Sequence, residues 1–519
     1  MAYIRRLLGG RIGLLLLCTV LTLLSARQID GGSIKGDATQ NLHIAHNLLH
    51  TGRFTLLSHP DAPPTSFREP LPPAVLALYL KLMTPPGQTM GFESLHYGEN
   101  TRFVKLSNLL WVFLGLLGSG LLFRQLCAQR WMALPAMALT AIFFFHNKVV
   151  INSLYTELPA GTFLLWSSWA LLRAMASPTR KRLLLAGALC GLLCLTKAVF
   201  LYAAPLVMLL TAWLWLRGPQ QTAPPRYAAG LRFGGLMLLG FALVVGPWLL
   251  RNQLLLNSLE VSSGRSGYVL FKRALLDQIS DAEFKAGFYL FGPNVYQQAV
   301  AGTSLQLLPG EATRRDGRAA RLNGAASEFL LSDKSALYAG RPDHVVSFYN
   351  RSAAVYVQLV KIFKAGHHPQ PEAAADRLMQ KVALRYMLAH PLDHLKTSVL
   401  LFWRGFWCIS PISNIPFTPN REAAKDIIFV TNVASGLALL VVFGLGLRRT
   451  QHRLAVMAAL PLAMMGVYTL LSQNLPRFTA PALPLMLLSL LWMLHLAAQA
   501  LWRVVRLRWR PLAPAALGV

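Results

Sequence analysis

Acidic side chains, and charged side chains in general, are scarce in this chain. Only 21 of its 519 residues are Asp or Glu, and all charged residues together make up 14%. Hydrophobic residues make up 54%. Ordinary soluble domains contain about 25% charged residues. The composition therefore excludes an ordinary soluble enzyme and indicates a membrane protein with many spans.

Cysteine is also rare, and several familiar motifs are missing. The five cysteines form no CxxC pair (Cys18, Cys127, Cys190, Cys194 and Cys408). This spacing indicates neither a disulfide framework nor a zinc site. The long segment Arg251 to Asp426 contains no Walker, Rossmann, HExxH or GxSxG motif, so nothing in it points to nucleotide, zinc-protease or serine-hydrolase chemistry.

Long apolar runs are abundant instead. Ten segments are apolar over a length that crosses a bilayer or nearly does so. We predict spans at Ile12 to Ala26, Leu106 to Phe123, Trp131 to Phe145, Leu158 to Leu172, Leu183 to Thr196, Ala198 to Leu216, Leu231 to Leu250, Ile427 to Leu447, Leu454 to Leu471 and Thr479 to Leu501. The first run, which follows Arg5 and Arg6, also fits a cleaved signal peptide.

The 50 Lys and Arg residues do not indicate a nucleic-acid partner, because many of them flank the predicted spans. They fill every second connection, and these connections contain no Asp or Glu, so all 21 acidic residues fall in the alternate segments. Cytoplasmic loops of membrane proteins are rich in Lys and Arg. We therefore predict that both termini are cytoplasmic and that the long segments 28–105 and 251–426 lie outside.

The predicted fold class is an α-helical polytopic membrane protein. Its parts are a first transmembrane helix (1–27), a first outer loop with surface helices (28–105), a six-helix transmembrane region (106–250), a mixed outer domain (251–426) and the C-terminal spans with a basic tail (427–519). The apolar stretch His394 to Pro411 contains Lys396 and Arg404, and we predict an interfacial helix there. We find no repeated half of the kind that many transporters contain.

Asp37 is the carboxylate best placed for chemistry. It opens an amphipathic helix predicted over Ala38 to His50, which Gly52 ends; a second short apolar helix is predicted over Ala74 to Met83. In the structural interpretation, Asp37 is an N-cap and Gln40 completes a capping box. In the functional interpretation, Asp37 is a general base. A sugar phosphate is already activated, so a single base suffices for transfer.

Several motifs in the same order add a family resemblance. After Asp37 come Gly52-Arg53-Phe54-Thr55 and a stretch running from Pro64 to Pro73, then Ser153 to Glu157, Pro247 to Asn252, Ser263 to Tyr268 and Pro476 to Pro481. In these stretches the chain resembles the GT-C superfamily of glycosyltransferases. The likeness is to the family 39-like branch of protein O-mannosyltransferases and lipid A aminoarabinose transferases, and it thins out between Asp277 and Ala383.

By that resemblance Asp37 would be the catalytic base and Glu157 a second acidic residue that shapes the site. Glu157 stands just before a predicted span, where it would also complement the helix dipole. The chain departs from the family pattern at Glu69, which follows the basic Arg68 and could pair with it. The resemblance and the lack of an acidic cluster in the first loop imply a metal-independent reaction. Asp281-Ala282-Glu283 is interpreted as a solvated helix face.

Five basic residues are predicted on the outer side: Arg68, Lys197, Arg251, Arg265 and Arg477. Fixed guanidinium and ammonium groups stabilise the charge that develops on a departing phosphate. For each residue singly, snorkelling or contact with lipid headgroups is the alternative. Lys197 stands out because it lies in a tight turn between two spans, where a charge needs a partner.

Together these features predict an inverting glycosyltransferase of the bacterial inner membrane. It would move a sugar from a polyprenyl-phosphate donor to a glycan, lipid or protein acceptor on the outer face, with membrane lipids but no nucleic acid as partners and no required cofactor. Acceptor choice is expected in the region Asp277 to Ala383. The alternatives are a flippase of polyprenyl-linked sugars, which would call for ionisable residues within several spans, and an O-antigen polymerase or ligase.

Overall fold

The structure is a computed structural model that describes residues 10–59, 61–218, 226–264, 266–324, 327–407, 421–448 and 451–508. All regular elements in these ranges are helices. The α-helices are α2 (Arg11–Ala26), α3 (Asp37–Thr51), α4 (Leu71–Met83), α5 (Phe92–His96), α6 (Thr101–Lys105), α7 (Asn108–Leu126), α8 (Ala133–Thr140), α9 (Lys148–Asn152), α10 (Glu157–Ala176), α11 (Arg180–Thr196), α12 (Phe200–Arg217), α13 (Arg226–Leu256), α14 (Ser266–Leu276), α15 (Asp281–Phe291), α16 (Asn294–Ala299), α17 (Leu330–Ala339), α18 (Phe348–Ala365), α19 (Pro371–Ala389), α20 (Pro391–Phe406), α21 (Arg421–Gly446), α22 (His452–Leu471), α23 (Pro476–Thr479) and α24 (Leu483–Arg508).

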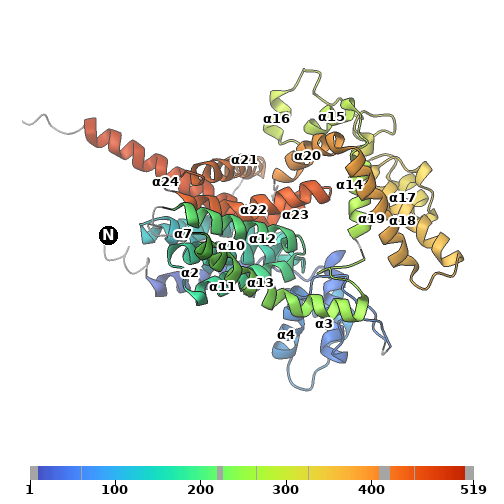
Figure 1. Ribbon diagram of the computed structural model, residues 1–519, viewed down its shortest axis with the longest axis horizontal. Coiled ribbons are helices and arrows are strands. Elements are labelled where there is room, and N and C mark those ends of the chain that lie inside the picture. Colours follow the sequence, from blue (N-terminus) through green and yellow to red (C-terminus); the bar gives the residue numbers. More distant parts are fainter. Residues whose placement is uncertain are drawn as a thin grey trace, which may run out of the picture.

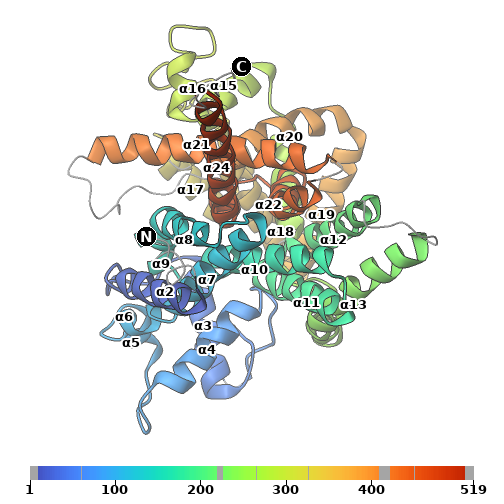
Figure 2. The ribbon, with the colours of Figure 1, turned by 90° about the vertical axis from the view of Figure 1, so that its left-hand side faces the viewer.

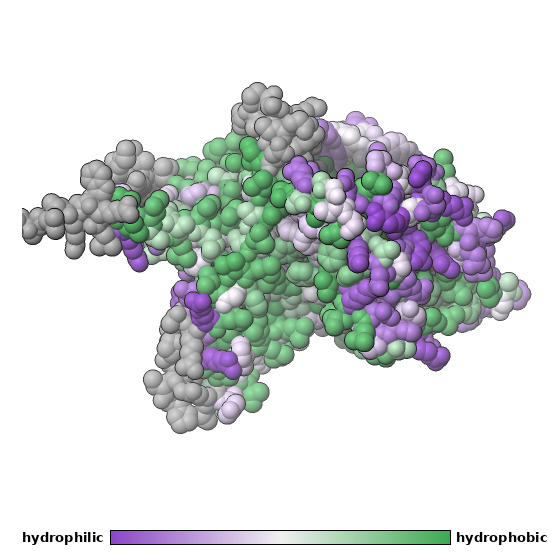
Figure 3. Space-filling model, turned by 90° about the horizontal axis from the view of Figure 1, so that it is seen from above, coloured by the Kyte–Doolittle hydropathy of each residue, from purple (hydrophilic) through white to green (hydrophobic). Residues whose placement is uncertain are grey.

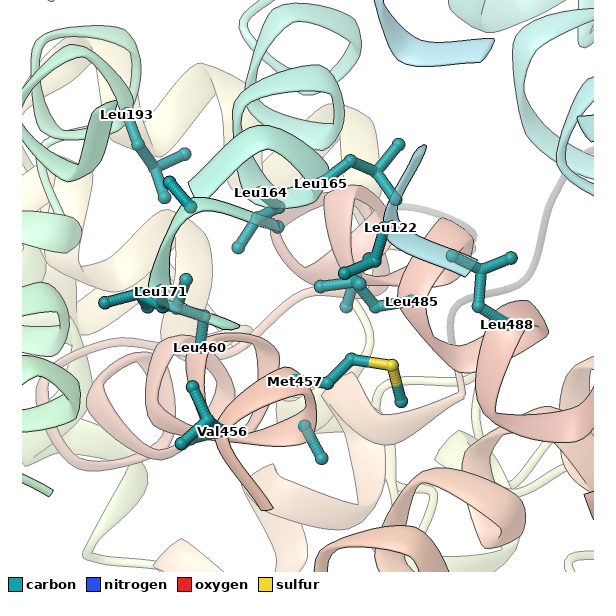
Figure 4. Packing of buried hydrophobic residues seen from close by; sticks show 14 of the residues in the cluster. Leu122, Leu164, Leu165, Leu171, Leu193, Val456, Met457, Leu460, Leu485 and Leu488 are labelled. Carbon is teal, nitrogen blue, oxygen red and sulfur yellow. The ribbon is translucent and has the colours of Figure 1, made fainter. Parts of the chain in front are cut away.

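The long apolar helices form a bundle, and α14 to α20 form a separate group at one end of it (Figure 1). We call the second group, residues 266–407, the cap. Helix α10 lies inside the bundle, where it packs against α7, α11, α22 and α24. Leu164, Leu165 and Leu171 of α10 meet side chains of these four neighbours (Figure 4). Because Glu157 is the first residue of α10, this packing fixes Glu157 at one end of the bundle.

Each of the ten predicted spans falls on helical structure, but not every one is long and apolar enough to cross a membrane. Among the described residues, six segments meet that test by length and composition: Thr101–Leu126, Phe200–Arg217, Tyr227–Leu256, Ile427–Gly446, His452–Leu471 and Pro476–Val505. Two further segments, Arg11–Ala26 and Arg130–Phe145, are apolar but shorter. The count of ten therefore stays a prediction.

Helices α10 and α11 are not among these six segments: α11 has 17 residues, and α10 includes buried polar residues such as Ser167 and Ser168. In α11, Gly187 approaches α13 so closely that a Cβ atom would lie 1.9 Å from the carbonyl oxygen of Met237. Gly240 of α13 lies in the same interface, where its Cβ would be 2.3 Å from the Leu184 oxygen. Small residues permit such close helix packing, so larger side chains at these two positions would push α11 and α13 apart.

Apolar side chains cover much of the bundle surface, whereas hydrophilic side chains gather over the cap (Figure 3). Leu206 of α12, and Leu243 and Leu254 of α13, are exposed. A large uncovered apolar surface on a folded chain suits contact with lipid. The architecture is that of a polytopic α-helical membrane protein, as the sequence predicted.

Helices α3 and α4 of the first loop lie side by side next to the bundle (Figure 2). Helix α3 ends at Gly52, whose φ of 67° is left-handed, as predicted from its glycine. Asp37 is not the N-cap of α3, contrary to the structural interpretation of this residue. The helix begins with Asp37 itself, and Gly36, with φ 62°, occupies the cap position without a side-chain hydrogen bond. The Asp37 carboxylate is therefore available for contacts outside its own helix.

Helix α20 covers most of the stretch predicted to be interfacial; residues 408–411 of that stretch lie outside the described residues. One face of α20 is exposed and apolar, with Leu392, Leu395 and Val399. The other face buries Leu400 and Leu401, and the helix packs against α15 and α22. An amphipathic helix beside an apolar bundle is consistent with the predicted interfacial role.

Candidate active site

A cavity of about 990 Å³ lies between the bundle and the cap. The side opposite the cap includes five of the predicted catalytic or donor-site residues: Asp37, Arg68, Glu157, Lys197 and Arg477. Its cap side includes Tyr268, Lys272, Tyr349, Tyr356 and Gln380. A pocket of this size, with a few polar groups that converge on one wall, is typical of a small-molecule site.

Two guanidinium groups hold the Asp37 carboxylate. Arg68 contacts its Oδ1 atom, and the Nη2 atom of Arg477 lies 2.5 Å from its Oδ2 atom. Burial alone would raise the pKa of Asp37, but the charges and hydrogen bonds of the two arginines outweigh burial and lower the pKa from 3.8 to about 2. Asp37 is therefore ionised and can accept a proton only weakly while both arginines remain in place.

Arg68 is held by the same helix that carries Asp37. Its Nε atom donates to Oε1 of Gln40 at 2.7 Å, and Gln40 follows Asp37 by three positions, on the same face of α3. The suggested pairing of Arg68 with Glu69 was wrong. Glu69 accepts a hydrogen bond of 3.3 Å from the backbone N–H of Ala198, in the turn that contains Lys197.

Arg477 links the second acidic residue to the first. Its Nε atom lies 3.4 Å from Oε1 of Glu157, and Nζ of Lys197 lies 3.5 Å from the same oxygen. Glu157 is buried at 5% exposure, and its Oε2 atom has no hydrogen-bond partner among the described residues. We call Asp37, Arg68, Glu157, Lys197 and Arg477 the charge network. An anion that enters this network competes with its carboxylates for the three cations.

Lys197, whose charge was predicted to need a partner, is buried and has two polar partners. The turn between α11 and α12 buries this residue to 4% exposure, where an unpaired charge would be costly. Besides Glu157, its ammonium group donates to the Thr156 hydroxyl at 3.4 Å. The ammonium group of Lys197 is therefore stabilised by Glu157 and Thr156 at the cavity, and it does not extend to the protein surface.

Arg251, another predicted phosphate-binding residue, does not join the charge network. Arg251 is absent from the described cavity lining; it donates to the Thr65 carbonyl oxygen at 2.8 Å and stacks 4.7 Å from the Trp248 ring centroid. It therefore ties the end of α13 to the first loop. Arg265 lies outside the described residues.

Sequence reasoning assigned no role to any single residue on the cap side of the cavity, although acceptor choice was expected in the region Asp277 to Ala383. The Lys272 ammonium group lies 4.3 Å from the ring centroid of Tyr268 and 4.0 Å from that of Tyr349. Tyr268 and Lys272 are four positions apart, so they share a face of α14, and this spacing was a usable signal. Nothing local in the sequence brings Tyr349 and Tyr356 of α18 to the same wall.

The described residues contain no group of three or more His, Cys, Asp or Glu side chains that could hold a metal ion. The pair Asp281 and Glu283 has structural partners. Glu283 completes a capping box with Ser280 and pairs with Arg321, and Asp281 pairs with Lys396. This pair acts in helix capping and ion pairing at the start of α15.

No protein-family model and no curated protein matches the chain. Among solved structures, the oligosaccharyltransferase of Archaeoglobus fulgidus in complex with Zn and sulfate matches over 94% of this chain and 50% of its own, with 11% identity and a TM-score of 0.46. This chain thus spans about half the length of that protein. ArnT of Cupriavidus metallidurans bound to undecaprenyl phosphate matches over 95% of this chain and 80% of its own, with 15% identity and a TM-score of 0.35. Both matches extend over most of this chain, at identities of 15% or less and TM-scores below 0.5.

Proposed function

We propose that the protein is an inverting glycosyltransferase that moves a sugar from a polyprenyl-phosphate carrier to an acceptor at the outer surface of the bacterial inner membrane. The observation that supports this proposal most directly is the Asp37 carboxylate between Arg68 and Arg477, on the wall of a cavity that borders an apolar helical bundle. A base and a phosphate-binding site are the two parts that such a transfer requires.

In the proposed step, an acceptor oxygen attacks the anomeric carbon of the sugar and gives its proton to Asp37. The bond between the anomeric carbon and the phosphate oxygen breaks, and polyprenyl phosphate leaves with the electron pair. Arg68, Arg477 and Lys197 stabilise the charge on the leaving phosphate. One attack at the face opposite the leaving group inverts the anomeric configuration.

The arginines also explain how a carboxylate with a pKa of about 2 can act as a base. A donor phosphate that enters the charge network attracts the guanidinium groups of Arg68 and Arg477 away from Asp37. Each contact that Asp37 loses removes an interaction with its charged form, so its pKa rises toward the usual value. Donor binding would thereby activate the base, and the donor would bind before the acceptor.

The remaining walls of the cavity suit the other parts of the substrates. Apolar side chains from α12 and α22, including Leu201, Val467 and Leu471, line it next to the bundle, where the first units of a polyprenyl chain would pack. The cap contributes Tyr349 and Tyr356 from the region where the family likeness is weakest. We assign acceptor selection to this cap wall.

Reconstitution into liposomes tests the proposed function. The purified protein receives a panel of radiolabelled undecaprenyl-phosphate sugars together with extracted cell-envelope acceptors, and both transfer and lipid translocation are measured. Transfer with inversion at the anomeric carbon is expected, and it should persist with EDTA, since no metal is proposed to take part. Translocation without transfer would support a flippase instead, and retention of configuration would refute the one-step reaction.

A further inference from the structure

Arg477 joins both carboxylates of the charge network, yet its own side chain is 45% exposed. Its contacts at 2.5 Å to Asp37 and 3.4 Å to Glu157 depend on where its backbone lies. That backbone belongs to the short segment between α22 and α24, which includes the four-residue helix α23 and a 3-10 helix of three residues, Ala480–Ala482. Something outside this segment must hold it in place, because a helix of one turn has little stability of its own.

Asn474 fixes the start of this segment. It is completely buried, and its backbone is left-handed with φ 42°. Asparagine adopts that conformation more readily than most residues other than glycine. Its side-chain Nδ2 atom donates to the Leu401 carbonyl oxygen of α20 and to the Thr469 hydroxyl of α22, both at 2.9 Å. One residue therefore shapes the turn and ties it to two helices.

Gly405 of α20 makes this close contact possible. A Cβ atom at this position would lie 2.2 Å from Nδ2 and 2.4 Å from Oδ1 of Asn474. The hydroxyl group of Thr479 donates to the Gly405 carbonyl oxygen at 2.5 Å. The segment is thus attached to α20 on both sides of Arg477, at residues 474 and 479.

A buried arginine of the cap, Arg273, links α20 and α22, the two helices to which Asn474 is hydrogen-bonded. Arg273 of α14 has no exposed surface. It donates from Nη2 to the His394 carbonyl oxygen of α20 at 2.9 Å and from Nε to the Thr469 carbonyl oxygen of α22 at 3.0 Å. Thr469 therefore meets Arg273 through its backbone and Asn474 through its side chain. The Arg477 segment is anchored to a frame of three helices.

We propose that Asn474 is a positioning residue that sets Arg477 between Asp37 and Glu157 by anchoring its segment to α20. This inference rests on the proposed function for its catalytic consequence, because Arg477 is assigned there to the donor phosphate. The anchor itself is a property of the fold and can be measured separately.

Two substitutions of Asn474 remove its hydrogen bond to Leu401 and still allow the left-handed backbone conformation. Asn474→Asp keeps the size of the side chain and its tolerance of a left-handed backbone, but a carboxylate cannot donate to the Leu401 carbonyl oxygen. Asn474→Gly keeps the backbone conformation and adds no buried charge. Asn257→Gly is the matched control, since Asn257 is also left-handed, at φ 50°, but lies after α13 and does not line the cavity.

The first measurement is hydrogen exchange of residues 472–479 in full-length protein in nanodiscs. Loss of a buried hydrogen bond should speed exchange of this segment by about tenfold to a hundredfold in both Asn474 variants. The control should leave it unchanged. Unchanged exchange in both Asn474 variants would overturn the anchor, whatever the activity of the protein.

The second measurement asks whether the anchor positions Arg477. Undecaprenyl phosphate, used as the probe, should bind both Asn474 variants about tenfold more weakly, as expected for a lost charge-assisted hydrogen bond. In a plot of kcat/KM against pH, the acidic limb should move to higher pH. The reason is that the pKa of Asp37 rises when it loses one of its two guanidinium partners. If both Asn474 variants bind undecaprenyl phosphate as tightly as the wild-type protein and the acidic limb does not move, the positioning role of Asn474 is refuted. If the wild-type protein neither binds the probe nor transfers sugar, the proposed function fails, and hydrogen exchange still decides the anchor.

Discussion

Replacing Asp37 with Asn should abolish most of the transfer activity while leaving the protein folded. Asn cannot accept the acceptor's proton, and removal of a general base typically lowers the rate by about a hundredfold to ten-thousandfold. Because Gly36 holds the N-cap position, the substitution does not disturb helix capping. The two effects of the carboxylate, on rate and on stability, can therefore be separated.

The cost in stability follows from the ion pairs that Asp37 makes. The fall of its pKa from 3.8 to about 2 corresponds to about 2.5 kcal/mol of preference for the charged form. Since 34% of the side chain is exposed, solvent screening reduces this figure to about 1 to 2 kcal/mol. A lowered carboxyl pKa stabilises the fold above the unfolded value, near 4, and this contribution is lost as the pH falls from about 4 to about 2. At neutral pH the wild-type protein has the full contribution, and Asp37→Asn loses it.

Asp30→Asn provides the matched control. Asp30 belongs to the same loop and also meets two cations, Lys105 at 3.0 Å and Lys148 at 3.3 Å, but it does not line the cavity. Both variants should lower the melting temperature modestly, and only Asp37→Asn should lose transfer in the liposome assay. Near-normal turnover of Asp37→Asn would refute the assignment of the base and make Glu157 the next candidate.

Three further outcomes are expected. A reporter fused near Gly310 should be active only outside the cytoplasm and one fused near Gln220 only inside, because the acidic residues are confined to alternate segments; a cytoplasmic Gly310 would contradict the topology. Arg477→Met should weaken binding of undecaprenyl phosphate by about tenfold, whereas Arg251→Met should mainly lower the melting temperature; equal losses of affinity would contradict this difference. Burial, aided by a neighbouring histidine, lowers the pKa of His43 below its usual 6.5, so protonation favours the unfolded state and stability should fall as the pH drops below about 6.5; His43→Phe should flatten that dependence in melting curves between pH 7.5 and 5.5.

Features that depend on local pattern could be predicted from the sequence. The surface helices α3 and α4 were predicted within a few residues from apolar spacing, and Gly52 was recognised as the end of α3. The tight turn at Lys197 was also found, because a lone charge between two apolar runs is conspicuous. Each of these signals lies within a window of about twenty residues, the length over which periodicity and capping act.

Features that depend on which elements meet could not be predicted. Arg251 and Arg477 looked equivalent in the sequence, yet the structure places Arg477 beside Asp37 and ties Arg251 to Thr65. Asp37 does not cap its helix; its carboxylate instead contacts two guanidinium groups, one of them from a residue 440 positions away. The burial of Ser167 and Ser168 in α10 likewise depends on the neighbouring helices, which hydropathy along the chain does not register.

The ion pair between Asp37 and Arg477 joins residues 440 positions apart, and this separation sets a time order on the assembly of the protein. Ribosomes add about 5 to 20 residues per second, so Arg477 emerges roughly 20 to 90 s after Asp37. Until then the nascent chain contains Asp37 and Arg68 but lacks the residue that links them to Glu157. The charge network is therefore complete only when the last helices join the bundle, and a chain released before that point would hold the proposed base without the full set of cations proposed to bind the phosphate.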